Sequence, residues 1–295
     1  MQNCNSILTG KQFNDKYQGQ TFIKLTNKKE IHNRFLFQTG FNIDHIPFNS
    51  KGECQPGGIY FCLLEKLALW INYSDWPMYY VRFVTIPDDA QVYEENNKFK
   101  ADKMILGERI PISELQIWTD PQYCWEAVEQ NPYALQYVKE QTAEMCLAAV
   151  KRNSYVIDCV KQQTPEICLA AVQQNANLLQ YVKKQTPEMC LLACKLNGLL
   201  LRYVKKQTEE ICLEAVKEDG MALQYVKDQT EEICLEAIKQ NPLAMWFVKE
   251  QTPEICLEAV KQNAYTLQYV REQTPEICLA AVQQNAYALQ CKQTP

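Results

Sequence analysis

The chain has 295 residues, of which 47% are hydrophobic and 22% are charged, a balance that excludes a predominantly disordered protein. It has no run of about 18 apolar residues, and its first residues lack the basic and apolar regions of a signal peptide. We therefore expect a protein that neither spans a membrane nor is secreted. The formal net charge of −5 lies entirely after residue 118 and disfavours nucleic acid as the main partner, because nucleic-acid binding depends on neutralised phosphates.

Residues 1–118 lack the 22-residue repeat, combine strand-like and helix-like patterns and contain most of the glycines, which predicts a separate α+β domain. Residues 79–86 are rich in β-branched and aromatic side chains and stop at a Pro-Asp-Asp turn, so they read as a strand. Residues 91–93 and 104–106 predict further short strands. Residues 63–72 place apolar side chains at i, i+3, i+4 and i+7, which predicts an amphipathic helix.

Five motifs of this region form an ordered set: Ile23–Asn27 followed by His32-Asn33, Thr39–Asp44, Cys54–Phe61, Ile86–Ala90 and Lys98–Lys103. Together they resemble an uncharacterised domain in proteins of Mimivirus-like giant DNA viruses of amoebae. In that family the domain, marked by Cys-x-Pro-Gly-Gly-Ile-Tyr-Phe, precedes ankyrin, pentapeptide or helical repeats. The resemblance indicates a lineage and implies no activity.

The order of a histidine strand, a Gly-Gly-x-Tyr-Phe strand and a later acid is also similar to ADP-ribosyltransferase domains. That resemblance implies that His32 and Tyr60 frame the nicotinamide of NAD and that Glu108 or Glu114 orients its ribose. No Tyr-x-Ser follows Gly58, which departs from the family pattern. Without this alternative we expect no catalytic residue, cofactor or metal, because turn glycines and core aromatics explain the same residues.

A period of 22 residues organises residues 119–295, and one cysteine marks each copy. These cysteines are Cys124, Cys146, Cys168, Cys190, Cys212, Cys234, Cys256 and Cys278. A fixed period of this length predicts an α-solenoid of about eight helix-turn-helix repeats. Stacked repeats lie about 8–10 Å apart, beyond the roughly 7 Å that a disulfide spans, and zinc-type Cys-x-x-Cys pairs are missing from the sequence. We therefore interpret these cysteines as small buried side chains.

Each copy is predicted to contain two short helices of about nine residues. In the copy beginning at Thr252-Pro253-Glu254, threonine is a good N-cap and proline suits the first helical position. Asn263 is predicted to end the first helix in the left-handed region and to cap the second. Helices this short are stable only when neighbouring repeats bury their apolar faces.

Equivalent positions form columns along the repeats, and two columns are candidate binding residues. The constant column consists of Lys139, Lys161, Lys183, Lys205, Lys227, Lys249 and Arg271. The next position, the variable column, holds Glu140, Gln162, Lys184, Lys206, Asp228, Glu250 and Glu272, so its charge changes sign along the chain. A solvated face explains both columns, and a striped surface for a protein partner is the alternative. An aromatic column (Tyr137, Tyr181, Tyr203, Tyr225, Phe247 and Tyr269) belongs either to the core or to an interface.

The copies resemble short helical repeats of unknown function in the same giant viruses and, more loosely, in some amoeba-associated bacteria. Cys159 and Asp219-Gly220 depart from the pattern, and the last copy drops two residues before Pro295. Because that end lacks a polar cap, we expect either self-association there or a frayed last copy.

The sequence thus predicts an α+β domain followed by a solenoid that acts as a scaffold or adaptor for a host or viral protein. The resemblance places it in the host cytoplasm or the virion. An ADP-ribosyltransferase-like enzyme whose repeats select the target is the alternative.

Overall fold

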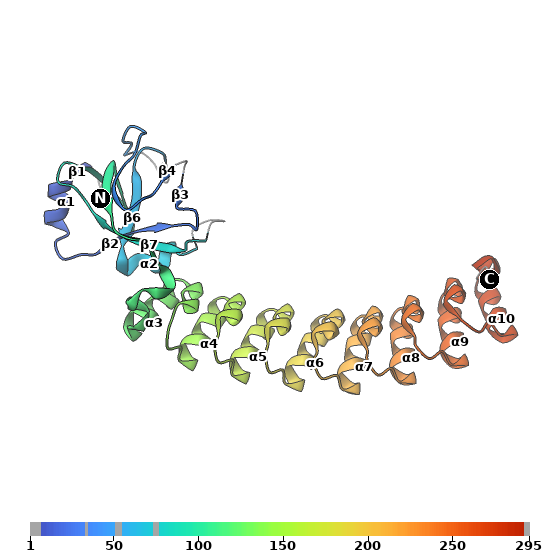
Figure 1. The fold of residues 1–295 in the computed structure, drawn as a ribbon. Coiled ribbons are helices and arrows are strands. Elements are labelled where there is room, and N and C mark those ends of the chain that lie inside the picture. Colours follow the sequence, from blue (N-terminus) through green and yellow to red (C-terminus); the bar gives the residue numbers. More distant parts are fainter. Residues whose placement is uncertain (1–6, 33–34, 51–54, 73–76, 292–295) are drawn as a thin grey trace, which may run out of the picture. The chain divides into compact units, whose positions relative to one another are not determined.

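The structure is a computed structural model that describes residues 7–32, 35–50, 55–72 and 77–291 (Figure 1). The chain divides into two compact units, residues 1–149 and 150–295. A region of β-sheet precedes a region of repeated helices, as predicted. The predicted domain boundary after residue 118 lies within the first unit and stays a prediction. Asn33 and Cys54, which belong to two of the motifs, lie outside the described residues.

Among the described residues, nine strands form an antiparallel sheet in the order β1-β8-β9-β6-β2-β7-β10-β5, with β11 beside β7. Their bounds are β1 Ile7–Thr9, β2 Phe22–Thr26, β5 Gly40–Ile43, β6 Ile59–Leu63, β7 Tyr80–Thr85, β8 Gln91–Glu95, β9 Lys98–Ala101, β10 Lys103–Leu106 and β11 Ile110–Pro111. The ribbon of β3 (Ile31–His32) and β4 (Phe35–Leu36) forms a separate two-stranded sheet.

The three strands predicted from composition are confirmed as β7, β8 and β10. β7 lies between β2 and β10, with Ile23 opposite Phe83 and Ile105 opposite Thr85. One face of the sheet packs on aromatic rings, among them Phe13, whose ring centroid lies 4.9 Å from that of Phe22. Phe13 comes from helix α1 (Gly10–Lys16), which the sequence analysis missed although Thr9 and Gln12 form a capping box at its start.

The predicted helix over residues 63–72 is confirmed in part, because only Leu67–Trp70 is α-helical. Strand β6 continues through Leu63, which pairs with Phe22, and a 3-10 turn (η1, Leu64–Lys66) leads into a single helical turn, α2 (Leu67–Trp70). The ladder hydrogen bonds of β2 outcompete helix formation at the start of this segment, since Leu64 N–H still donates to the Thr21 carbonyl at 2.8 Å. The predicted apolar face is nevertheless buried at Leu67, Ala68 and Ile71.

After the turns η2 (Ile112–Glu114) and η3 (Gln116–Thr119), α-helices and 3-10 helices alternate. The α-helices are α3 Pro121–Gln130, α4 Ala143–Arg152, α5 Pro165–Gln174, α6 Pro187–Leu196, α7 Glu209–Glu218, α8 Glu231–Gln240, α9 Pro253–Gln262 and α10 Pro275–Gln284. The 3-10 helices are η4 Pro132–Gln136, η5 Ser154–Cys159, η6 Ala176–Tyr181, η7 Gly198–Tyr203, η8 Gly220–Tyr225, η9 Pro242–Phe247, η10 Ala264–Tyr269 and η11 Ala286–Cys291.

The second helix of each copy therefore differs from the prediction of two helices of about nine residues. It is a 3-10 helix of five or six residues, whereas the α-helix has ten. At the end of η10, Val270 N–H donates to the Leu267 carbonyl at 3.1 Å. This bond spans three residues, as in a 3-10 helix, where an α-helix would span four.

The caps explain where the helices begin. The Thr252 hydroxyl accepts from Ile255 N–H at 3.3 Å, which confirms the predicted N-cap. The Asn263 side chain caps the 3-10 helix by accepting from Tyr265 N–H at 3.0 Å. Asn263 is extended (φ −146°, ψ 104°), so the predicted left-handed conformation is wrong. An N-cap residue takes extended geometry, and this role decides its conformation.

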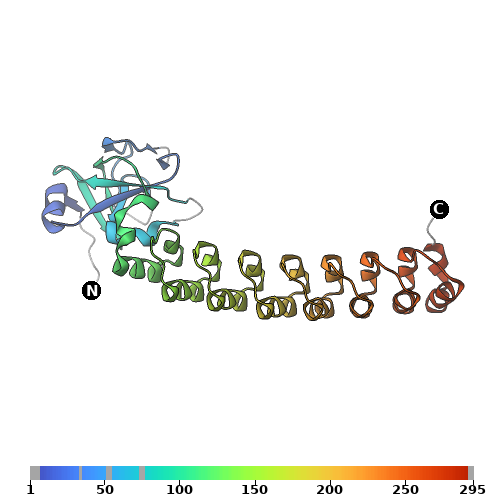
Figure 2. The same cartoon turned by 60° about the horizontal axis from the view of Figure 1, so that its bottom comes forward.

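Within the second unit, the α-helices from α5 to α10 lie side by side in one row and the 3-10 helices in another (Figures 1 and 2). The predicted core faces are buried: Ile255, Cys256, Ala259 and Val260 in α9, and Ala264 and Leu267 in η10. Neighbouring copies thus bury each other's apolar faces, as helices of this length require.

We expect Leu223→Ala to lower the free energy of unfolding by about 2–5 kcal/mol, because Leu223 is 0% exposed and its loss leaves a cavity between helices. Leu243→Ala, at a position 43% exposed on the next 3-10 helix, is the matched control and should cost less than about 1 kcal/mol. Urea denaturation of the full chain measures both. Equal midpoints for the two variants would contradict the assignment of Leu223 to the core.

Candidate interaction surface of the repeats

A glutamine in the link before each α-helix ties successive repeats together. The Gln185 Nε2 group donates to the carbonyl oxygens of Leu179 at 3.2 Å and of Tyr203 at 2.8 Å. Its Oε1 atom accepts from Lys205 N–H at 2.9 Å. One amide therefore bonds to carbonyl groups of two successive 3-10 helices, η6 and η7, and to the backbone N–H that follows η7. Inter-repeat contacts of this kind are also made by Gln163, Gln207, Gln229 and Gln251.

The cysteine five residues later is directed at the same amide. Cys190 is 3% exposed, and its thiol donates to Gln185 Oε1 with a sulfur–oxygen distance of 3.6 Å. Burial raises the pKa of the Cys212 and Cys234 thiols to about 11, so both are protonated and unreactive near neutral pH. In the part of the chain that the structure describes, no group of three or more metal-ligating side chains is placed to hold an ion.

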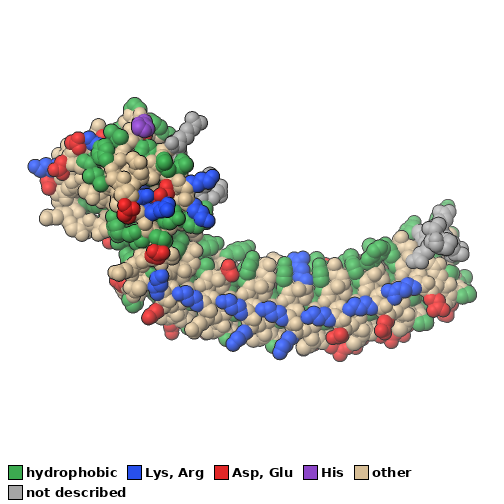
Figure 3. Space-filling view, in the orientation of Figure 1, with side chains coloured by type: hydrophobic (Ala, Val, Ile, Leu, Met, Phe, Trp, Pro, Cys, Tyr) green, Lys and Arg blue, Asp and Glu red, His purple; other side chains and the backbone are tan. Residues whose placement is uncertain are grey.

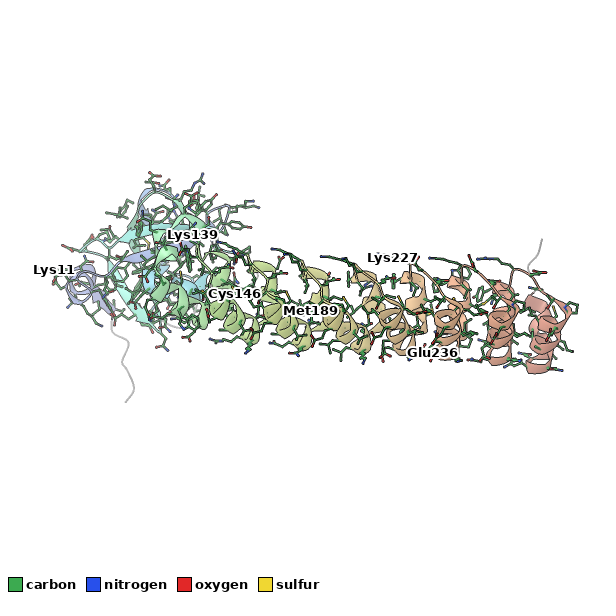
Figure 4. The ribbon with its side chains drawn as sticks, turned by 90° about the horizontal axis from the view of Figure 1, so that it is seen from below. Lys11, Lys139, Cys146, Met189, Lys227 and Glu236 are labelled. Atoms are coloured by element: carbon green, nitrogen blue, oxygen red, sulfur yellow. The ribbon has the colours of Figure 1, made fainter. Side chains whose placement is uncertain are left out.

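The last four members of the constant column, Lys205, Lys227, Lys249 and Arg271, donate from their side chains to backbone carbonyls of the preceding repeat. The Lys205 ammonium donates to the carbonyl oxygens of Val182 at 2.9 Å and Lys183 at 2.8 Å in the preceding repeat. Lys249 repeats this arrangement, and Arg271 does so with its guanidinium. These carbonyls follow the C-terminal end of a 3-10 helix, where a positive charge is favourable. Figure 4 shows Lys227 and Glu236 at opposite edges of the repeated region.

The variable column lies beside these residues and is exposed. In the second unit it contains the neutral Gln162 and five charged residues, Lys184, Lys206, Asp228, Glu250 and Glu272. Among the residues that the structure describes, none of these five side chains forms a hydrogen bond or an ion pair. Glu140, the acidic member predicted at the start of the column, is exposed as well but belongs to the first unit. The variable charges are therefore available to a partner, in contrast to the side chains of Lys205, Lys227, Lys249 and Arg271.

The outward face of the 3-10 helices carries large apolar side chains. With three residues per turn, the second and fifth positions of each 3-10 helix eclipse each other and point the same way. Large apolar residues at these positions are exposed: Tyr155 59%, Leu243 43%, Trp246 67%, Tyr265 49% and Tyr287 68%. Figure 3 shows hydrophobic side chains along one edge of the repeats, with a row of Lys and Arg below them.

Most copies place a glutamine at the fifth position of the 3-10 helix, where its amide supports the helix itself. Gln224 Nε2, for example, donates to the Met221 carbonyl at 2.9 Å. Trp246 replaces this glutamine in η9, and its ring meets that of Tyr269 in the next repeat edge-on at 5.0 Å. The sequence analysis missed Trp246, although a tryptophan in a column of glutamines was a usable signal.

The aromatic column lies between core and surface. Tyr203, Tyr225, Phe247 and Tyr269 are half-buried, and Tyr181 is 44% exposed. Arg202 lies over the Tyr203 ring, with its guanidinium carbon 4.7 Å from the ring centroid. The column thus contributes to both the packing between repeats and the surface.

The residues of the transferase alternative lie on separate elements. Tyr60 is in β6, and its hydroxyl donates to Glu95 Oε1 at 3.1 Å, beside the ammonium of Lys98. Glu108 follows β10, from which β2 and β7 separate β6 in the sheet, and Glu114 ends η2. Both acids are exposed, and no described contact joins either to Tyr60. His32 lies in the separate ribbon, and its side chain is outside the described set.

A known family matches most of the repeats. Residues 164–291 match, in overlapping windows, the family described as Domain of unknown function (DUF4116). The windows are 164–207, 186–230, 208–252, 230–274 and 252–291. No solved structure matches the chain. Among the described residues, no helix is both long and apolar enough to cross a membrane.

Relatives occur in Acanthamoeba polyphaga mimivirus. Putative ankyrin repeat protein R229 is 28% identical over 109 residues, or 32% of this chain and 35% of that protein. Putative ankyrin repeat protein R868 is 27% identical over 104 residues, or 33% of this chain and 50% of that protein. The chain therefore spans no more than half of either relative. These findings support a Mimivirus-type repeat protein of unknown function, and the resemblance carried by the N-terminal motifs stays a prediction.

Proposed function

We propose that the chain is an interaction scaffold in which an α-solenoid of about eight 22-residue repeats, residues 119–295, follows an α+β domain, residues 1–118. The solenoid surface binds a host or viral protein in the host cytoplasm or the virion. Repeated helices that contact only their neighbours form an extended surface that can bind a partner without a catalytic centre. This architecture supports the role of an interaction scaffold. Self-association through the last copy stays a prediction, because residues 292–295 lie outside the described structure.

The observation that carries the proposal is the exposed apolar row on the 3-10 helices. Trp246 is 67% exposed, and Leu243 and Tyr265 beside it are 43% and 49% exposed. Tryptophan and tyrosine dominate the binding energy of protein interfaces, and a water-exposed row of them costs solubility unless a partner covers it. The names of two relatives describe ankyrin repeat proteins, which gives further support for a repeat scaffold.

We expect the double variant Trp246→Ala, Tyr265→Ala to lose a protein that the full-length wild type captures from mimivirus-infected amoebae. Truncation of such anchors typically weakens binding by about 2–4 kcal/mol, or 30-fold or more. Leu196→Ala, which removes a side chain 57% exposed at the end of α6, is the control and should retain the protein. Quantitative mass spectrometry of the captured material measures the difference.

A captured set that is identical for the wild type and the double variant would contradict the proposed surface. The urea midpoint of the double variant is measured as well, because the Trp246 ring contacts that of Tyr269 and the Tyr265 hydroxyl accepts from Asn285 Nδ2 at 3.3 Å. Capture is compared under conditions in which both chains are fully folded.

A further inference from the structure

The backbone positions of the variable column are fixed in the same way in every repeat of the second unit. Each variable residue follows a constant residue whose N–H is held by the glutamine of the preceding link. The N–H groups of Lys183, Lys205 and Lys227 donate to glutamine Oε1 atoms at 2.8, 2.9 and 3.0 Å. Those of Lys249 and Arg271 do so at 2.9 Å. The variable side chains therefore start from equivalent points, one per repeat.

Their charges change in blocks along this regular row. Lys184 and Lys206 are basic, and Asp228, Glu250 and Glu272 are acidic. The Lys183 ammonium adds to the basic block, because it too forms no described hydrogen bond or ion pair. Figure 3 shows the corresponding change on this face, with acidic side chains gathering below the Lys and Arg row toward the C-terminal repeats.

The spacing of the row suits an extended chain. Packed helices lie about 8–10 Å apart, and a chain in the extended polyproline II conformation advances about 3.1 Å per residue with three residues per turn. Every third side chain of such a segment therefore points the same way, at a spacing that matches one repeat. A segment of about 13 extended residues then reaches all five charges. A helix rises only about 1.5 Å per residue and needs roughly twice that length of chain.

Resting on the proposed function, we propose that the partner presents an extended segment with two acidic residues against Lys184 and Lys206 and three basic residues against Asp228, Glu250 and Glu272, one at every third position. Charge complementarity of this kind fixes the register of a bound segment and rejects segments of other patterns. The exposed apolar row supplies affinity, and the charge blocks select the sequence.

The test uses the full chain and fluorescent 13-residue peptides. One peptide carries Glu at positions 1 and 4 and Lys at positions 7, 10 and 13, with neutral polar residues elsewhere. A second has the reverse order, since the chain direction is not fixed by charge. A third has the same composition out of phase, with Lys at positions 1, 7 and 13 and Glu at positions 4 and 10. Fluorescence anisotropy measures binding at low and high salt.

We expect one of the two ordered peptides to bind at least about tenfold more tightly than the out-of-phase peptide at low salt, and this preference to vanish at high salt. The charge-reversed chain should bind that peptide more weakly and should instead bind the peptide in which Glu and Lys are exchanged. The charge-reversed chain carries Lys184→Glu, Lys206→Glu, Asp228→Lys, Glu250→Lys and Glu272→Lys. The control chain Glu218→Lys, Lys261→Glu changes two exposed charges at the ends of α7 and α9 and should bind as the wild type does.

Equal binding of all three peptides would overturn the inference. Tighter binding of a longer helical peptide, with the same five charges placed seven residues apart, would also overturn it. Capture of the same cellular protein by the wild-type and charge-reversed chains would also overturn it, while the proposed function stood. Failure of the wild type to capture any Trp246-dependent protein would instead contradict the proposed function itself.

Discussion

Gln185→Ala lowers the free energy of unfolding by about 2–4 kcal/mol, a large effect for a half-buried polar side chain. The change removes hydrogen bonds to the carbonyl oxygens of Leu179 and Tyr203, in successive 3-10 helices, and to Lys205 N–H, at 2.8–3.2 Å. The Leu179 carbonyl still accepts from Val182 N–H, whereas loss of the bonds to the Tyr203 carbonyl and the Lys205 N–H costs about 1–3 kcal/mol each where water does not replace the amide. The loss also uncouples neighbouring repeats, so we expect a broader urea transition as well as a lower midpoint.

The matched control is Gln180→Ala, five residues earlier. Gln180 Nε2 donates to one exposed carbonyl, that of Asn177 at 3.1 Å, within its own 3-10 helix. Water replaces this bond easily, so we expect a loss below about 1 kcal/mol. Urea denaturation followed by circular dichroism compares the two variants. A loss for Gln185→Ala no larger than that for Gln180→Ala would show that the amide does not join the repeats.

Raising the pH from 8 to 10 destabilises the repeats by roughly 5 kcal/mol. Burial raises the pKa of Cys146, Cys212 and Cys234 to about 11 and that of Cys194 to about 12, from the ordinary thiol pKa of 9.0. Above pH 9 the unfolded chain releases these protons while the folded chain keeps them, so stability falls as pH rises. At pH 10 each thiol contributes a loss of about 1.4 kcal/mol.

A buried lysine acts in the opposite direction in the β-sheet region. Burial lowers the pKa of Lys24 to about 8 from 10.5, so its neutral form is favoured in the fold and the contribution of this group to stability rises between pH 8 and 10.5. The neighbouring Cys62 thiol, whose pKa burial raises to about 12, offsets part of that gain above pH 9. Helix circular dichroism at each pH, with urea and a reductant, therefore follows the repeats separately from the sheet. Cys194→Ala should reduce the loss at pH 10 by about 1.4 kcal/mol. A free energy of unfolding that is constant from pH 8 to 10, or an unchanged loss in Cys194→Ala, would contradict the assignment.

Features with local causes were predictable from the sequence. The Thr caps, the buried columns and strands β7, β8 and β10 follow from the chemistry of adjacent residues. The 3-10 helices were not, because six residues such as Ala264–Tyr269 are too few to distinguish a spacing of 3.0 from one of 3.6. The start of the helix predicted over residues 63–72 was wrong because Leu63 instead pairs with Phe22 in strand β2, which is distant in sequence.

The candidate site was predicted only in part from the sequence, because some of its contacts join residues far apart in the chain. Both charged columns were recognised from their 22-residue spacing, but the roles of Gln185 and Lys205 depend on carbonyl groups in neighbouring repeats. The partner of Tyr60, Glu95, lies 35 residues away in sequence. Sequence periodicity identifies equivalent positions, but the structure is needed to tell which charges bind backbone. Lys205, Lys227 and Lys249 do so, whereas the five variable charges form no hydrogen bond or ion pair within the described chain.

One capture experiment with two matched variants tests this division of roles. The constant-column variant is the double substitution Lys205→Gln, Lys249→Gln. The variable-column variant is the double substitution Lys184→Gln, Lys206→Gln. Both remove two positive charges from the full chain. The amount of cellular protein retained by each is measured by mass spectrometry at physiological salt. We predict that the variable-column variant loses the partner and that the constant-column variant keeps it. Loss of the partner by the constant-column variant alone, with an unchanged urea midpoint, would contradict the account.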